Sequence, residues 1–164
     1  MAVRHQLIAR KPAAVWEVLE DSRRYGDWVV GPTGSDPLDD SWPEVGSTIA
    51  YKLRLGVLEM TGRTVVRRHE PPRWLELEAH CDPLGSARIA LDIRPWGEET
   101  LVIVDEHPLR GFGGLVHNFA LDALLQLRHR NMLKRLAKVV EGLPPEADHS
   151  GAGRGPAAER PAGR

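Results

Sequence analysis

The sequence contains a single cysteine, Cys81, and no apolar run long enough to cross a lipid bilayer. One cysteine cannot close a disulfide within the chain, so the fold needs no oxidising compartment. Residues 1–12 also lack the continuous apolar core of a secretory signal peptide. Together these absences predict a cytoplasmic protein that is not stably inserted in a membrane.

Neither sign of charge is in excess. The chain has 22 lysine and arginine residues against 23 aspartate and glutamate residues, which gives a formal net charge of −1. Such a balance creates no field that attracts nucleic acid or an anionic membrane, so neither is expected as a partner. With 164 residues and 41% apolar content, the chain is long enough for one hydrophobic core and too short for two. We expect one domain, present as a monomer or a weak homodimer.

The sequence lacks the short motifs of common catalytic and cofactor sites. It has no phosphate-binding glycine loop, no zinc-ligand spacing and no nucleophile motif of the Ser-His-Asp kind. The histidines are His5, His69, His80, His107, His117, His129 and His149, and no two of them are four residues apart. A metal site would need ligands from distant segments. We therefore predict neither a metal nor a cofactor.

Two segments near the ends of the chain are predicted to be strands. Residues 2–8 alternate in a way typical of a strand, which would turn His5 inward together with Val3 and Leu7. Residues 100–107 are apolar on both sides, so their periodicity does not give an orientation. This second strand is expected to be covered on both faces.

Two short helices and a loop follow the first strand. Pro12 suits the first turn of a helix in which apolar residues recur at helical spacing. A second helix is expected over residues 22–28, with Ser22 as its N-cap. Residues 30–46 are rich in Gly, Pro, Asp and Ser, which predicts a loop with one short strand near residues 36–40.

Alternating apolar and polar residues predict a series of antiparallel strands in the middle of the chain. Each has one apolar face, and turn signals of Gly, Pro and Ser separate neighbours. These strands cover residues 49–55, 58–66, 74–81 and 87–94, of which the last two alternate most regularly. An antiparallel sheet of this kind buries one face and needs a cover.

The cover is an amphipathic helix predicted over residues 115–141. Its apolar stripe consists of Leu121, Leu125, Met132, Leu136, Val139 and Val140, which share one face at about 100° per residue. About 27 residues at about 1.5 Å each make a rod of about 40 Å. Arg128 and His129 lie at or beside the stripe, where a dry core would favour Leu or Ala. Because a twisted sheet diverges from a straight rod, we expect a ligand-sized cavity between them.

The C-terminal segment differs in composition from the rest. Residues 144–164 contain Gly, Pro, Ala and balanced charge but no Val, Ile, Leu or aromatic residue. Such a segment cannot bury enough surface to order itself. The sequence predicts one α+β domain over residues 1–143 and a disordered tail over residues 144–164.

Motifs spread over residues 1–142 resemble those of one known superfamily. They are Pro12-Ala13-Ala14-Val15-Trp16-Glu17-Val18-Leu19 with Asp21, Tyr25 and Trp28, then Pro43-Glu44-Val45-Gly46, then Glu106-His107-Pro108 with Gly111, and finally Arg130-Asn131 with Leu133, Leu136 and Ala137. In this order they resemble the helix-grip superfamily SRPBCC, which includes START-like lipid transfer domains, aromatic polyketide cyclases and the birch pollen allergen fold. The chain looks most like the small bacterial polyketide cyclase/dehydrase-like and lipid-transport-like members.

The resemblance implies a helix-grip fold, in which a seven-stranded antiparallel sheet with two short helices wraps around a long C-terminal helix and leaves an apolar tunnel. Members bind sterols, lipids, polyketides, plant hormones or quinones, and only some are catalysts, so the fold does not give the function. Our first hypothesis is binding of an apolar or amphipathic small molecule, such as a lipid, a polyketide or a related aromatic, in the internal cavity. The alternative is an aromatic polyketide cyclase or dehydratase that uses His or acidic residues there.

The residues expected to line the ligand site come from all parts of the predicted domain. They are His5, Trp28, Tyr51, Leu53, Leu77, Leu91, His107, Phe112, His117, Leu121, Leu125, Arg128, His129 and Met132.

Two interpretations stay open for the polar residues of this set. His129, tuned by Asp122 two helical turns earlier, would transfer a proton to or from the ligand, or it is a structural group beside the stripe. Arg128 either binds a carboxylate or enolate oxygen or extends past the stripe to water. Catalysis would require convergence on the cavity of at least two residues from the set His5, Asp105, Glu106, His107 and His129.

Overall fold

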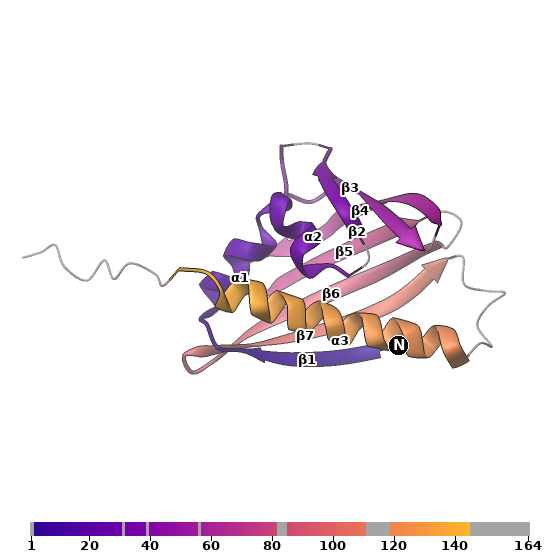
Figure 1. Cartoon of the computed structure of the whole chain (residues 1–164). Helices are drawn as coiled ribbons and strands as arrows, with labels where there is room; N and C mark the ends of the chain where they lie inside the picture. Colours follow the sequence, from indigo (N-terminus) through magenta and orange to yellow (C-terminus); the bar gives the residue numbers. More distant parts are fainter. Residues whose placement is uncertain are drawn as a thin grey trace, which may run out of the picture.

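A computed structural model of the chain describes residues 2–30, 32–38, 40–55, 57–81, 85–110 and 119–144. They form an α+β fold in which an antiparallel sheet of seven strands curves around a long helix (Figure 1). The strands are β1 (Ala2–Ile8), β2 (Pro32–Pro37), β3 (Thr48–Leu55), β4 (Leu58–Glu70), β5 (Trp74–Cys81), β6 (Gly85–Trp96) and β7 (Glu99–Arg110). The helices are α1 (Pro12–Leu19), the 3-10 helix η1 (Ser22–Arg24), α2 (Tyr25–Trp28) and α3 (Phe119–Glu141).

The order of strands in the sheet is β1-β7-β6-β5-β4-β3-β2. The strands from β2 to β7 are therefore a meander, and β1 lies at the far edge beside β7. The long helix α3 runs along β1 and contacts α1 and α2 as well (Figure 1). This is the helix-grip arrangement that the resemblance implies, and it confirms the predicted fold class.

The two faces of the sheet differ as the alternation predicts. The inner face, which is turned toward α3, is apolar and buried, and its central residues are Leu75, Leu77, Ile89, Leu91, Ile93, Val102 and Val104. Register brings these side chains together, since Leu91 pairs with Leu75 on one side and with Val104 on the other. Full burial of one such side chain stabilises the fold by about 1.5–3 kcal/mol.

The C-terminal half of α3 closes one end of this core. Of the predicted stripe, Met132, Leu136 and Val140 are buried and Val139 is partly exposed. Leu133 and Ala137, which the prediction did not include, are buried as well, and Arg130 is exposed on the other side. None of the helices in the described ranges is long and apolar enough to cross a bilayer.

Polar contacts fix this end of α3 to the turn after β1. The guanidinium of Arg10 donates to the carbonyl oxygens of Leu143 at 2.8 Å and Pro144 at 3.0 Å. The side chain of Glu141 accepts from the backbone N–H of Ala9 at 2.9 Å. The direction of α3 across the sheet is therefore set at its C-terminus.

The first strand faces the opposite way to the prediction from its alternation. Val3 and Leu7 are 54% and 40% exposed and His5 is exposed, whereas Ile8 is fully buried. Pairing with β7 decides this orientation, because His5 lies opposite the outward-facing Ile103. A shift of one residue turns every side chain of a strand to the other face, and apolar residues at both 7 and 8 left the sequence ambiguous.

Other boundaries differ from the predictions in smaller ways. The short strand expected near residues 36–40 is β2, which begins four residues earlier at Pro32. The second helix is split into η1 and α2, and its N-cap is Asp21, which accepts from the backbone N–H of Arg23 at 3.0 Å, not Ser22. The expected helix start at residues 115–118 and the tail beyond residue 144 lie outside the described residues.

Candidate functional site

The inner face of the sheet is not covered evenly along its strands. Near the C-terminal end of α3, Leu75 and Val102 are fully buried. At the opposite end, toward which the N-terminal half of α3 extends, the inner-face residues Gly62, Ala79 and Ala87 are partly exposed (Figure 1). We call this part of the inner face, with Met60, Cys81 and Glu106 around it, the open end.

Small residues form the middle of the open end. Ala79 pairs with Ala87 on β6 and with Thr64 on β4, so the three lie in one row across the strands. Methyl groups fill little of the space above a sheet, whereas the neighbouring row contains the larger Leu77 and Ile89. A row of small side chains on an apolar face suits contact with a small apolar molecule.

A cluster of four aromatic rings stands beside this row, with Tyr25 at its centre. The ring centroid of Tyr25 is 5.5 Å from that of Trp28 and 5.9 Å from that of Trp42, both in edge-to-face geometry, and 6.5 Å from that of Tyr51. The hydroxyl groups of Tyr25 and Thr64 are hydrogen-bonded at 2.6 Å, and both residues are buried. This bond ties α2 to the inner face of β4. The cluster is defined here as Tyr25, Trp28, Trp42 and Tyr51.

The ring of Tyr51 lies over Gly62, its direct partner on the neighbouring strand. Its hydroxyl donates to the carbonyl oxygen of His80 at 3.1 Å, so the side chain spans β4 and reaches β5. A Cβ atom at position 62 would overlap the Tyr51 ring. Glycine is needed here because the aromatic side chain occupies the space that any other residue would require.

The tryptophans differ in how their indole N–H groups are satisfied. Trp16 donates to the carbonyl oxygen of Pro72 at 2.6 Å, and Trp42 donates to that of Leu19 at 3.2 Å. Trp28 is 1% exposed, and its N–H has no acceptor in the described part of the chain. A buried donor without an acceptor costs about 1–3 kcal/mol.

Charged residues near the open end lie mostly on the outer face. Glu106 is on the inner face and 8% exposed. Its neighbours Asp105 and His107 point outward, where His107 Nε2 lies 2.9 Å from Asp105 Oδ2. His5 is also on the outer face. The expectation that His5 and His107 face the cavity is therefore wrong, because strand alternation puts them on the side away from α3.

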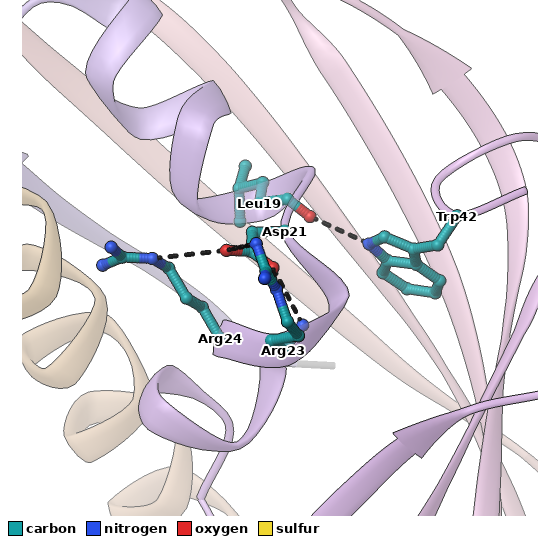
Figure 2. Close-up of polar contacts among 5 residues, drawn as sticks. All are labelled: Leu19, Asp21, Arg23, Arg24 and Trp42. Atoms are coloured by element: carbon teal, nitrogen blue, oxygen red, sulfur yellow. Dashed lines mark hydrogen bonds and ion pairs between the residues drawn. The ribbon is translucent and has the colours of Figure 1, made fainter. Parts of the chain in front are cut away.

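A polar cluster lies at the junction of α1 and η1 (Figure 2). Asp21 accepts from Arg23 Nε at 3.1 Å and lies 3.5 Å from Arg24 Nε. The Arg23 side-chain hydrogen bond is the largest effect on the pKa of Asp21 and lowers it, against the opposing effect of partial burial. In the same region Trp42 reaches back to the carbonyl oxygen of Leu19, which ends α1.

The structure places five of the predicted site residues on the buried side of the domain. Trp28, Tyr51, Leu77, Leu91 and Met132 are all buried there, and their contact with a ligand stays a prediction. Leu53, Leu121, Leu125, Arg128 and His129 belong to β3 or α3, but their side chains are not among those described. Phe112 and His117 lie outside the described residues.

Sequence reasoning missed Gly62 and Thr64. A glycine inside a strand pattern is a sign of close approach by another group, and this signal at Gly62 was available. No local pattern gives the partner of the Thr64 hydroxyl, because Tyr25 is 39 residues away. No group of three or more His, Cys, Asp or Glu side chains among the described residues is arranged to bind a metal.

Comparison with known proteins agrees with this architecture. Residues 2–141 match the family model described as polyketide cyclase / dehydrase and lipid transport. No curated protein matches the chain.

Solved structures share the fold at low sequence identity. A protein from Arthrobacter aurescens superposes with a TM-score of 0.68 at 15% identity, covering 93% of this chain and 92% of that one. The Zhui aromatase/cyclase from Streptomyces sp. R1128 superposes with a TM-score of 0.65 at 14% identity, covering 85% of this chain and 92% of that one. The protein CV1439 from Chromobacterium violaceum superposes with a TM-score of 0.64 at 16% identity, covering 85% of this chain and 96% of that one.

Proposed function

Because the chain belongs to the polyketide cyclase/dehydrase and lipid transport family, we propose that it binds an apolar or amphipathic small molecule between the inner face of its sheet and α3. The observation that carries this proposal is the open end. There the inner-face residues Gly62, Ala79 and Ala87 keep partial exposure, whereas the large apolar residues at the centre of the same face are buried. A protein that used this face only as a core would gain stability by filling it with larger side chains.

The surroundings of the open end favour an aromatic or fused-ring molecule. Leu77 and Ile89 border it on the core side, and Tyr51 lies on β3 across Gly62. Aromatic side chains offer large, flat apolar surfaces with restricted orientation. A lipid, a polyketide or a related aromatic molecule matches these surfaces.

The first experiment tests whether the protein, as purified from cells, contains a bound small molecule. Denaturing the protein and analysing the released small molecules by mass spectrometry should identify an apolar compound at a stoichiometry near one per chain. Binding is then measured with the neutral fluorescent probe N-phenyl-1-naphthylamine. If no compound is released and the probe does not bind, the proposal is wrong.

The position of the ligand site is tested with two substitutions that each introduce a phenylalanine. Ala79→Phe fills the small-residue row, whereas Thr61→Phe adds the same ring to the exposed face of β4. We expect Ala79→Phe to weaken probe binding by about tenfold or more, because the new ring takes apolar surface that the probe would otherwise bury. A tenfold change corresponds to the burial of well over one methylene group. Thr61→Phe should leave the affinity for the probe unchanged. Equal affinities in both variants would place the probe elsewhere.

A cyclase or dehydratase activity is the second possibility that the family match raises. It needs at least two proton-transfer groups at one cavity. Of His5, Asp105, Glu106 and His107, only Glu106 is on the inner face. Ligand binding is therefore the function that the described side chains support.

A further inference from the structure

The two edges of the sheet differ in how they are protected against pairing with a further strand. The strand order ends in β2 on one side and in β1 on the other. β2 contains Pro32, Asp36 and Pro37, and its pairing with β3 is interrupted by a register shift. Proline, charge and such irregularities keep sheet edges from pairing. β1 contains neither proline nor glycine and pairs with β7 in one unbroken register, so it is the less protected edge.

The outer side of β1 is apolar and exposed. Val3 and Leu7 are two of the large apolar residues that the fold leaves exposed, and His5 lies exposed between them. The pairing with β7 continues this surface, because Leu7 lies opposite Leu101 and His5 lies opposite Ile103, and both partners are partly exposed. Apolar side chains beside an unprotected edge are typical of a strand that pairs with another chain.

The helix α3 leaves the middle of β1 uncovered. Its last residue, Glu141, reaches the end of the strand and accepts from the N–H of Ala9 at 2.9 Å. All five side chains of residues 3–7, on both faces of the strand, are exposed or partly exposed. Within this stretch the carbonyl oxygen of Leu7 accepts from the side-chain amide of Gln6 at 2.9 Å, a surface contact that the backbone of a second strand would replace.

The sequence of β1 is complementary to itself in one antiparallel register. With His5 opposite the partner's His5, Val3 meets the partner's Leu7 on the outer face and Arg4 meets the partner's Gln6 on the inner face. A shift of two residues one way would oppose Arg4 to the partner's Arg4, and like charges directly opposite are destabilising. The same shift the other way would move Val3 beyond the end of the partner strand.

We propose that β1 pairs antiparallel with β1 of a second copy of this chain, about a two-fold axis at His5. The two sheets then form one continuous sheet. Each β1 edge is used once and the protected β2 edges become the outermost strands, so the assembly closes at the dimer. This inference is independent of the proposed ligand site, which lies on the inner face between the sheet and α3.

The dimer is measured first by sedimentation equilibrium over a wide range of protein concentration. One pair of short strands buries less than the roughly 1,200–2,000 Å² of a stable interface, so we expect a reversible dimer with a micromolar dissociation constant. A mass equal to that of one chain at every concentration up to about 1 mM would overturn the proposal.

Paired charges test the register. Val3→Glu combined with Leu7→Lys creates an opposite-charge pair on each side of the axis, whereas Val3→Lys combined with Leu7→Lys creates two like-charge pairs. Two such pairs should make the first double variant dimerise at least about tenfold more tightly than the second. Val45→Lys, at an exposed apolar position between β2 and β3, is the control and should dimerise like the wild type. Equal dissociation constants for the two double variants would refute the register.

A cysteine at the two-fold axis provides a test that depends on position. His5→Cys places the two introduced thiols opposite each other and should give a disulfide-linked dimer on mild oxidation. Leu7→Cys should not, because the two introduced thiols are then four residues apart, roughly 13 Å along the strands, beyond the span of a disulfide. The wild type, which has only the buried Cys81, is the control. Equal linkage of the two variants, or no linkage of His5→Cys, would refute pairing about His5.

Discussion

The ring of Tyr51 occupies the space in which any side chain at position 62 would have to lie. Gly62 and Tyr51 are direct partners on β4 and β3, and the Tyr51 hydroxyl continues across β4 to the carbonyl oxygen of His80. One glycine thus allows an aromatic residue to lie flat on the sheet beside the open end. The aromatic wall of the candidate site depends on this pair.

Gly62→Ala should destabilise the protein by about 1–3 kcal/mol, because the new methyl group overlaps the Tyr51 ring and forces it to move. The free energy of unfolding is measured by urea denaturation. The same substitution in a Tyr51→Ala background should cost much less, since the ring is then absent. Equal costs in the two backgrounds would show that the two residues do not interact. Thr61→Ala, at an exposed neighbouring position, is the control.

The Tyr25–Thr64 pair should show strong coupling in a double-mutant cycle. Tyr25→Phe or Thr64→Val alone removes one member of a buried pair bonded at 2.6 Å and should cost about 1–3 kcal/mol. The double variant should cost less than the sum of the two, because no hydroxyl is left buried opposite an apolar group. Additive costs, measured by urea denaturation, would contradict a direct bond.

Asp21 should contribute stability that is lost at acidic pH. Its pKa in the folded chain is lowered from the usual value of about 3.8, chiefly by the Arg23 hydrogen bond. A group whose pKa is lower when folded stabilises the protein above the unfolded-state value, and this contribution disappears as the pH falls through the folded-state value. The unfolding free energy should thus decrease below about pH 4 less steeply in Asp21→Asn than in the wild type.

The size of this effect is limited by solvent. Arg23 is largely exposed, so solvent screens the pair, and its contribution to the unfolding free energy should be small and should weaken at high salt. Asparagine preserves the N-cap acceptor, so the substitution isolates the charge. Identical pH profiles for Asp21→Asn and the wild type would refute the assignment.

His5→Ala and His107→Ala should leave probe binding within about twofold of the wild type, since both side chains lie on the face of the sheet away from α3. His129→Ala is compared with them, because His129 belongs to α3 and was predicted to border the cavity. Fluorescence titration with N-phenyl-1-naphthylamine measures all three. A loss of affinity in His107→Ala without a loss of stability would contradict the outward assignment.

The regular alternation of β5 and β6 made those strands predictable. Leu75 and Leu77, and Ile89 and Leu91, recur every second residue with polar neighbours between them, and this period allows only one buried face. The helix stripe through Met132 and Leu136 was predictable for the same reason at a period of 3.6 residues.

The orientation of β1 was not predictable from its own residues. Apolar side chains occur on both faces of β1, so its pattern fits either orientation, and pairing with β7 made the choice. The same pairing, acting through alternation along β7, placed Glu106 inside and His107 outside. A strand near the edge of a sheet takes its orientation from its neighbour, and that neighbour is about 100 residues away along the chain.

The sequence by itself determined which segments become strands and helices and that one long amphipathic helix covers the sheet, because these properties depend on periodicity within short windows. Only the tertiary structure decided which polar groups meet. The Tyr25–Thr64 bond and the Tyr51 ring over Gly62 both join residues from different elements. Such contacts depend on strand register and helix placement, which no local pattern encodes.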